Sequence, residues 1–508
     1  MIKDFASYKQ ETGGRAILLF LLFGLAIYQF FTAGFSAFAM VCASPLLIIT
    51  IYIAFKRPMV VFWLLCIYNY VIFGITRNNL MISGVPISLV TEGLEILLLG
   101  VAIMDARQTP HFERAGNLML YALLVWCGFC TLEVLNDTCG LGINILAWYQ
   151  GARMLAFQVL YAFLVFTIYI NDAKRLVQYL LFFTGLSLFG SLYALKQKYI
   201  GFSPAESAWL VGSVTHVLQG GTLIRYFSVY SDAANFGEGI AATAVAFFIF
   251  GITTKIKKLR YLFLITSVLC VWGMFLSGTR TAMACLGVGI ISYIFLSKSF
   301  KIAIPVTIFF ALSFIFLAYT NIGQGNQQIR RMRSVFNRKN DNSANVRTIN
   351  QETMRKYLKE APWGIGLGMN HDNVPSNNKY TIMSSIPPDS HYVFVWIHTG
   401  RIGLVVFIIT MLLMLGGACW IVLFRLRSPS LRGIGAGFCC AFIAIQVGAY
   451  GNEVLFQFPN CLVFYGGLTI VYILPFIEKE WVEYEAKELA IQEEKERLKL
   501  EKKKASRV

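Results

Sequence analysis

Apolar runs of about 20 residues, separated by short polar segments, make up most of this chain. A helix needs about 20 residues to cross the hydrocarbon core of a bilayer. The pattern therefore predicts an all-α polytopic membrane protein with about 12–14 transmembrane helices, the polar segments marking the turns between them. The candidate spans are centred near residues 25, 45, 67, 94, 126, 161, 186, 245, 269, 289, 311, 410, 443 and 469.

One polar segment, residues 321–391, is much longer than the others and separates two late spans. It is rich in lysine and arginine, and residues 345–360 within it are expected to form a helix. Gly364, Gly366 and Gly368 then alternate with apolar residues. They lack the preceding strand and the Lys-Ser/Thr of a phosphate-binding loop, so a flexible turn is the simpler interpretation. A polar insert of this length in an apolar chain is where aqueous chemistry is expected.

Composition supports a membrane protein and excludes several other classes. Of the 508 residues, 57% are hydrophobic and only 14% are charged, whereas soluble domains carry about 25% charged residues. The net charge of +17 sits mainly in short loops between spans, which indicates membrane orientation and no nucleic-acid partner. Most of the 11 cysteines lie in apolar runs, and the Cys127/Cys130 pair has no matching ligands elsewhere, so neither a metal nor a redox site is expected.

The distribution of lysine and arginine predicts which loops face the cytoplasm, because cytoplasmic loops of membrane proteins carry an excess of both. If the N-terminus is cytoplasmic, the short outside loops hold only Arg77 and Arg280. We therefore expect both termini in the cytoplasm, residues 321–391 outside, and residues 478–508 as a charged cytoplasmic helical tail. The expected cytoplasmic charges are Lys56, Arg57, Arg107, Arg114, Lys174, Arg175, Lys255, Lys257, Lys258, Arg260, Lys298, Lys301, Arg425, Arg427 and Arg432.

Glu92, Glu95 and Arg153 are ionisable residues inside the predicted spans. Glu92 and Glu95 lie three positions apart on one helical face, and Arg153 lies near the outer end of another span. Ionisable groups within a bilayer are rare and tend to be paired or functional. Two interpretations stay open: a structural Glu–Arg contact, or the coupling network of a secondary transporter.

Three polar sites share the extracytoplasmic side under this topology. Residues 225–235 precede a span, residues 277–281 form a hairpin that holds Arg280 at the membrane–water boundary, and residues 321–391 carry Arg347 and His391. A guanidinium binds diphosphate oxygens bidentately without losing its charge, and a neutral imidazole accepts a proton from a hydroxyl group. A lipid-linked diphosphate presents its phosphates at this depth, so these groups favour stabilisation of a departing lipid pyrophosphate without a metal.

Taken singly, these residues have plainer interpretations. An interfacial arginine such as Arg280 is often an anchor to lipid phosphate, and a histidine at a helix start such as His391 is often a cap or surface residue. The sequence contains no D-x-D, H-E-x-x-H, Walker or G-x-S-x-G motif and no Cys/His cluster. No metal centre, no cofactor and no ATP-driven transport are therefore expected.

Taken together, the polar elements resemble the O-antigen ligase and O-antigen polymerase superfamily of bacterial membrane glycan transferases. Arg225 with Asp232 and Asn235 resembles its Arg…Asp-x-x-Asn signature before a span. The Ser-Gly-Thr-Arg sequence at residues 277–280 resembles its Ser-x-(Ser/Thr)-Arg turn.

The large loop completes the resemblance, which spans about residues 220–410. The Asn-x-Arg at residues 345–347 and the Pro-Trp-Gly-x-Gly-x-Gly at residues 362–368 resemble the loop arginine and its P-x-G-x-G-x-G stretch. Residues 390–404 resemble the family's His-Asn…Gly-x-x-Gly ending, although Tyr392 stands where asparagine is common.

The resemblance implies a GT-C-like helical fold in the bacterial cytoplasmic (inner) membrane. It also implies transfer of a glycan from undecaprenyl pyrophosphate to an acceptor hydroxyl, on lipid A–core or a growing polysaccharide, on the periplasmic side. Partners would be these substrates, membrane lipid and envelope polysaccharide assembly proteins. The catalytic residues it implies are His391, Arg280 and Arg225. The implied substrate-binding residues are Arg347, Asp232, Asn235, Thr279 and Asn345.

Several alternatives stay open within and beyond this family. A ligase would act on lipid A–core, a polymerase on another repeat unit and a related oligosaccharyltransferase on protein. From other classes, a secondary transporter would use Glu92 and Glu95, and a scaffold would contact partners through the tail. The expected organisation is N-terminal transmembrane helices at 1–195, a ligase-like core at 196–410 including loop 321–391, C-terminal transmembrane helices at 411–477, and the tail at 478–508.

Overall fold

The structure is a computed structural model that describes residues 20–78, 88–104, 111–213, 215–218, 223–297 and 342–505, most positions between 318 and 333 and a few between 305 and 316. The chain forms two compact units. Unit 1 comprises residues 1–68 and 75–109, and unit 2 comprises residues 69–74 and 110–508. Unit 2 contains every residue of the candidate site.

Unit 1 is built from apolar helices. They are α2 (Phe35–Lys56), most of α3 (Pro58–Arg77) and α4 (Ser88–Met104). Glu92 and Glu95 are both buried on α4, and neither carboxylate oxygen of Glu95 has a hydrogen-bond partner among the described residues. Arg153 belongs to unit 2, so a contact between it and these glutamates stays a prediction.

Unit 2 is also helical, with one short antiparallel strand pair, β1 (Val217–Leu218) and β2 (Leu223–Ile224). Two π-helical segments interrupt its long helices, Arg153–Phe157 after α6 and Ile421–Arg425 after α17. The helices are α5 (Leu118–Leu132), α6 (Ile145–Ala152), α7 (Gln158–Tyr169), α8 (Ala173–Tyr199), α9 (Pro204–Val211), α10 (Ala233–Thr253), α11 (Lys257–Ser277), α12 (Arg280–Ser297), α14 (Gln327–Arg333), α15 (Asn342–Leu358), α16 (Thr381–Ser385), α17 (His391–Trp420), α18 (Pro429–Gly451) and α19 (Asn460–Ala505).

Ten of the fourteen predicted spans are confirmed by the lengths of these helices. Among the described residues, ten helices are long and apolar enough to cross a membrane, and each contains one of the predicted centres. The runs near residues 25 and 45 hold the shorter apolar helices Phe20–Ala33 and Ser44–Lys56, and the run near 94 is the 17-residue α4. The run near 311 lies mostly outside the described residues. The chain is thus an all-α, multi-pass membrane protein.

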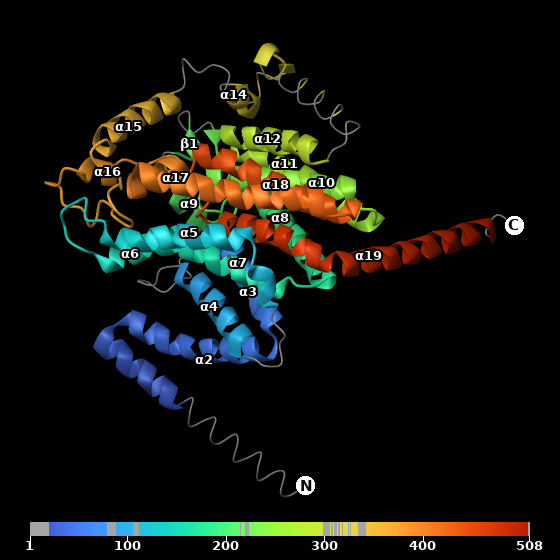
Figure 1. Cartoon of the computed structure of the whole chain (residues 1–508), viewed down its shortest axis with the longest axis horizontal. Helices are drawn as coiled ribbons and strands as arrows, with labels where there is room; N and C mark the ends of the chain where they lie inside the picture. The colour runs from blue at the N-terminus through green and yellow to red at the C-terminus, as the bar shows by residue number, and fades with distance from the viewer. Residues whose placement is uncertain are drawn as a thin grey trace, which may run out of the picture. The chain divides into compact units, whose positions relative to one another are not determined.

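Helix α10 forms the centre of unit 2 and is buried along most of its length. It packs most extensively against α11 and α18, and then against α12 (Figure 1). Glycines permit the close approach: a methyl group at Gly437 of α18 would collide with the Phe250 ring of α10, and one at Gly251 with Leu264 of α11. The residues at the ends of α10 are therefore held by several neighbouring helices.

The two ends of this bundle carry different chemistry. At one end Lys255 bridges to Glu485 at 3.2 Å, and Glu478 accepts from the backbone amides of Arg427 and Ser428 at 2.7 and 2.6 Å. These contacts involve α19, which continues as a single helix past the bundle (Figure 1). Asp232 caps the other end of the 21-residue α10, about 30 Å away at 1.5 Å per residue, close to the thickness of a hydrocarbon core.

Candidate active site

The guanidinium of Arg225 lies on the turn between α11 and α12. A short β-hairpin, in which Val217 pairs with Ile224, comes just before Arg225 in the chain. Its Nη2 donates to Thr279 Oγ1 at 3.0 Å and its Nε donates to the Ser277 carbonyl at 3.3 Å. The Arg225 motif and the Ser-Gly-Thr-Arg motif are separate in the sequence. In the structure they are in direct contact.

Arg225 is the meeting point of several charges. Burial lowers its pKa, and the nearby Asp232 and Glu238 oppose this effect, whereas Arg280 and Arg347 add to it. Even so, a guanidinium stays protonated in proteins. The structure thus brings together the three arginines that the sequence assigned to diphosphate binding.

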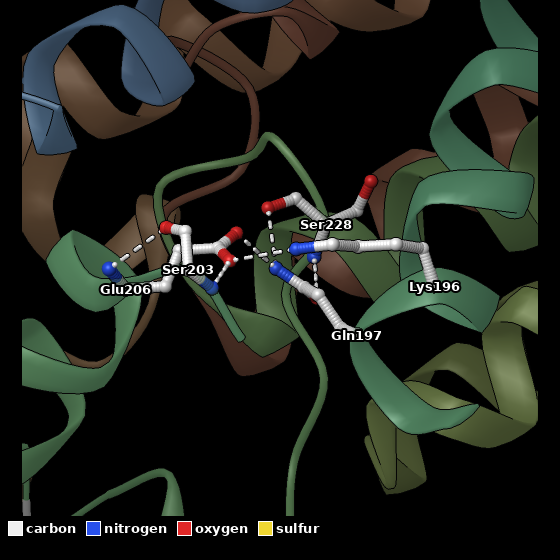
Figure 2. A network of polar contacts seen from close by, with 5 residues as sticks. All are labelled: Lys196, Gln197, Ser203, Glu206 and Ser228. Carbon is white, nitrogen blue, oxygen red and sulfur yellow. Dashed lines mark hydrogen bonds and ion pairs between the residues drawn. The ribbon is translucent and has the colours of Figure 1, made fainter. Parts of the chain in front are cut away.

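A buried polar network fixes the backbone just after Arg225. Ser228 adopts a left-handed conformation, φ 54°, which is uncommon for a residue with a side chain. Gln197 of α8 holds it there by accepting from its amide at 2.9 Å and donating to its carbonyl at 3.2 Å (Figure 2). Glu206 of α9 in turn accepts from Gln197 at 2.7 Å and completes a capping box with Ser203 (Figure 2). Helices α8 and α9 therefore fix the backbone three residues after Arg225.

The predicted binding residues Asp232 and Asn235 serve the start of α10. Asp232 is the N-cap and accepts from the amides of Ala234 and Asn235 at 2.7 and 2.9 Å. Asn235 is fully buried, and its Nδ2 donates to Ser231 Oγ and to the Phe458 carbonyl at 2.9 and 2.8 Å. Both side chains stabilise the start of α10. The Asp232 carboxylate also lies near Arg225.

Thr279 is likewise a buried link. Its hydroxyl accepts from Arg225 and donates to the Ala233 carbonyl at 2.8 Å, joining the turn to the start of α10. Gly278 before it takes the left-handed C-cap conformation of α11, φ 59°, which lets the chain reverse directly into α12 at Arg280. The turn is as tight as the sequence predicted.

The segments that carry Arg280, Arg347 and His391 meet at the end of α18. The Glu238 carboxylate of α10 accepts hydrogen bonds from the hydroxyl of Thr281, next to Arg280, and from the amide of Asn452. The Asn452 carbonyl accepts from the backbone amide of His391 at 3.3 Å. Arg347 Nη2 donates to the adjacent Gly451 carbonyl at 2.8 Å. We call Glu238, Thr281, Gly451 and Asn452 the Glu238 junction; it connects α10, α12, α15 and the start of α17.

His391 is the first residue of α17 and is 2% exposed. Its ring packs against Phe407 and Phe456, with centroids 5.3 Å away in each case. Neither ring nitrogen has a hydrogen-bond partner among the described residues. A buried imidazole costs free energy when its polar atoms are unpaired, so such a group is a candidate for binding or catalysis. Tyr392 is oriented away from this role, because its hydroxyl donates to Gln446 of α18 at 2.6 Å.

The glycine-rich stretch after α15 packs against a break in α17. Gly400 leaves helical geometry at φ 65°, ψ −169°, so the carbonyls of Ile397 and His398 lose their usual helical partners. The amides of Ile365 and Gly366 donate to these two carbonyls at 2.9 and 3.1 Å instead. The stretch forms turns, as expected, and its amides replace hydrogen bonds that the helix has given up.

Asn345 and Glu453 are two further polar residues of this region. Asn345 is exposed on α15, and no contact joins its side chain to the residues above within the described part of the chain. Glu453 follows the junction, and burial, with Asp389 and Asp232 nearby, raises its pKa to about 7. Its carboxyl therefore changes charge near neutral pH at the edge of the arginine cluster.

Sequence reasoning missed Glu238 and Asn452. Glu238 was detectable as a carboxylate inside an apolar run, by the same criterion that singled out Glu92 and Glu95. Asn452 carries no signal of its own, because its importance comes from contacts to Thr281 and Glu238, which lie 171 and 214 positions away in sequence. Within the described residues no group of three or more histidine, cysteine or acidic side chains is arranged to hold a metal.

Comparison with known proteins agrees with this arrangement. Residues 265–408 match the family model described as O-Antigen ligase. The matched stretch includes Arg280, Arg347, Gly400 and His391, whereas Arg225 lies before it. A comparison with curated proteins found no match. Residues 265–408 therefore carry the match to an O-antigen ligase domain, which supports the resemblance to the O-antigen ligase and O-antigen polymerase superfamily.

Proposed function

We propose that the chain transfers a glycan from undecaprenyl pyrophosphate to an acceptor hydroxyl, either on lipid A–core or on a growing polysaccharide. The observation that carries this proposal is the convergence of Arg225, Arg280 and Arg347 around the junction that also holds the start of the His391 helix. The site lies at the end of the bundle opposite the basic residues that the sequence places in the cytoplasm. A periplasmic reaction in the inner membrane, with both termini cytoplasmic, follows from that orientation.

The reaction needs two groups of opposite function. The acceptor oxygen forms a bond to the anomeric carbon of the glycan, and the bond from that carbon to the phosphate oxygen breaks. The proton of the acceptor hydroxyl passes to a ring nitrogen of His391, and the electron pair of the broken bond leaves on undecaprenyl pyrophosphate. Arg225, Arg280 and Arg347 stabilise that departing charge by hydrogen bonds that require no change of protonation.

His391 suits this role because its two ring nitrogens are not committed to protein partners among the described residues. A buried, neutral imidazole can accept a proton only when the acceptor hydroxyl enters its pocket, so hydrolysis by bulk water is disfavoured. The rings of Phe407 and Phe456 pack against the imidazole and give it apolar surroundings.

The proposal is tested in a strain deleted for the gene and complemented with the chain or its variants. His391→Ala and Arg280→Ala should each abolish glycan transfer while protein levels in the membrane stay normal. Full transfer by both variants at normal levels would refute the site. The envelope profile of the deletion strain distinguishes the acceptor: free polymer absent from lipid A–core indicates a ligase, and a single repeat unit on the core indicates a polymerase.

A further inference from the structure

His216 is a buried histidine just before the β-hairpin that precedes Arg225, and it is 4% exposed. Its ring packs against Trp209 of α9 and against Phe227, with centroids 4.7 and 5.8 Å away. Its backbone carbonyl accepts from the amide of Arg225 at 2.9 Å, and the carbonyl of Thr215 accepts from Arg225 Nη1 at 3.1 Å. His216 and the residue before it therefore hold both the backbone and the guanidinium of Arg225.

The ring of His216 completes the N-terminal cap of α10. Asp232 accepts from the amides of Ala234 and Asn235, which are the second and third of the helix. The first amide, that of Ala233, donates to Nε2 of His216 at 3.0 Å. The first amides of a helix have no acceptor within the helix itself, so the acceptor for Ala233 has to come from another segment. An amide can only donate, so Nε2 carries the lone pair and Nδ1 carries the proton.

The other nitrogen joins the ring to the segment between α9 and the hairpin. Nδ1 of His216 lies 2.6 Å from Ser213 Oγ and 3.0 Å from Thr215 Oγ1. Because Nδ1 carries the proton, it donates to these hydroxyl oxygens. The neutral imidazole thus donates on one side and accepts on the other, and both of its nitrogens are bonded.

Four residues form a closed loop of hydrogen bonds that begins and ends at Arg225. Arg225 Nη2 donates to the Thr279 hydroxyl at 3.0 Å, and that hydroxyl donates to the Ala233 carbonyl at 2.8 Å. The Ala233 amide donates to the His216 ring, and the His216 carbonyl accepts from the Arg225 amide. Hydrogen bonds in such a network support one another, so loss of the imidazole should loosen the guanidinium as well as the start of α10.

A helix cap alone would not require an imidazole here. Serine, threonine, aspartate and asparagine are the usual groups that accept from the first amides of a helix. An imidazole accepts as they do and also donates through its second nitrogen, so one side chain connects α10 to the segment whose carbonyls hold Arg225.

We infer that His216 is a positioning residue for glycan transfer, which acts by fixing the guanidinium of Arg225. This inference rests on the proposed function, in which Arg225 stabilises the departing diphosphate. His216 itself contacts neither the donor nor the acceptor, and it exchanges no proton in the reaction.

The test is a double-mutant cycle in the complementation assay, with the rate of glycan transfer divided by the amount of chain in the membrane. His216→Phe keeps a ring and removes both nitrogens. It should lower the rate about tenfold when Arg225 is present, and it should have no further effect in Arg225→Lys, which lacks the guanidinium. His216→Gln, whose amide oxygen can accept from Ala233, should restore the rate to within about threefold of wild type. His111→Phe is the matched control: His111 is a partly exposed histidine in a predicted cytoplasmic loop, and its change should leave the rate unaltered.

The outcomes separate this inference from the proposed function. An equal loss of rate in the Arg225 and Arg225→Lys chains, with a lower Tm of purified His216→Phe, would show that His216 only stabilises the fold and would overturn the inference. An unchanged rate in His216→Phe would overturn it as well. If the wild-type chain transfers no glycan, or Arg225→Lys transfers at the wild-type rate, the proposed function fails, and the inference with it.

Two further variants keep the test decisive. If His216→Phe does not reach the membrane, His216→Asn takes its place in the cycle, because asparagine keeps a donor near the position of Nδ1 and is too short to reach Ala233. If Arg225→Lys leaves no measurable transfer, the comparison of His216→Phe with His216→Gln decides: a higher rate for the glutamine variant supports the inference, and equal rates overturn it.

Discussion

The Glu238 junction offers a quantitative test of how the site is held together. Thr281 and Asn452 both donate to Oε1 of Glu238, and Oε2 has no hydrogen-bond partner among the described residues. Glu238→Ala removes the acceptor of both bonds. A buried donor left without its acceptor costs about 1–3 kcal/mol, so leaving both donors unpaired should cost about 2–6 kcal/mol. If misplacement of Arg280 and His391 raises the activation free energy of transfer by about 3 kcal/mol of this loss, the rate of glycan transfer falls by about 100-fold.

Glu238→Gln is the matched control for this loss. Its carbonyl can replace Oε1 and accept from both donors, and its amide nitrogen takes the place of the unpartnered Oε2. Because both donors keep an acceptor, the glutamine variant should retain transfer within about tenfold of wild type. Both variants are assayed for glycan transfer and for Tm in the same membranes. Equal transfer by Glu238→Ala, Glu238→Gln and wild type would refute the view that this junction positions the active groups.

The remaining predictions concern pH, packing and an alternative function. The pKa of Glu453 is raised from an ordinary 4.5 to about 7, so the folded chain binds more protons than the unfolded chain between these two pH values. The free energy of unfolding should therefore fall as the pH rises from about 4.5 to 7. Glu453→Gln should flatten the profile of Tm against pH, and an unchanged slope would contradict this. Gly368→Ala should destabilise the chain far more than Gly142→Ala in thermal melting, because both have positive φ but only Gly368 faces a backbone carbonyl, that of Ala147; equal losses would show that φ alone decides. Glu95→Gln should leave glycan transfer unchanged in the complementation assay, whereas loss of proton- or sodium-dependent uptake in liposomes would favour a transporter instead.

The sequence was sufficient to locate the membrane helices, because a span must be both long and apolar and such runs are visible without any tertiary information. It also supplied the turn at residues 277–281, since two helices separated by so few residues leave room only for a tight reversal. The contact between Arg225 and Thr279 was not readable in the same way, because the two residues lie 54 positions apart and belong to different helical hairpins.

Other parts of the site depend on tertiary packing alone. The break at Gly400 lies within the long helix α17, and the docking of residues 362–368 against it supplies the hydrogen bonds that make the positive φ of Gly400 favourable. Asp232, Asn235 and Thr279 were predicted to bind substrate from the resemblance. The structure shows their side chains bonded within the protein, which favours a positioning role that a motif cannot reveal.

One measurement tests the central claim most directly: an experimental structure of the full chain in a nanodisc with undecaprenyl pyrophosphate bound. The account predicts a diphosphate within hydrogen-bond distance of the guanidinium groups of Arg225, Arg280 and Arg347, with the His391 ring facing the position that the acceptor hydroxyl occupies during transfer. A diphosphate bound elsewhere, or one bound here with His391 still enclosed by Phe407 and Phe456 and out of reach, would contradict it.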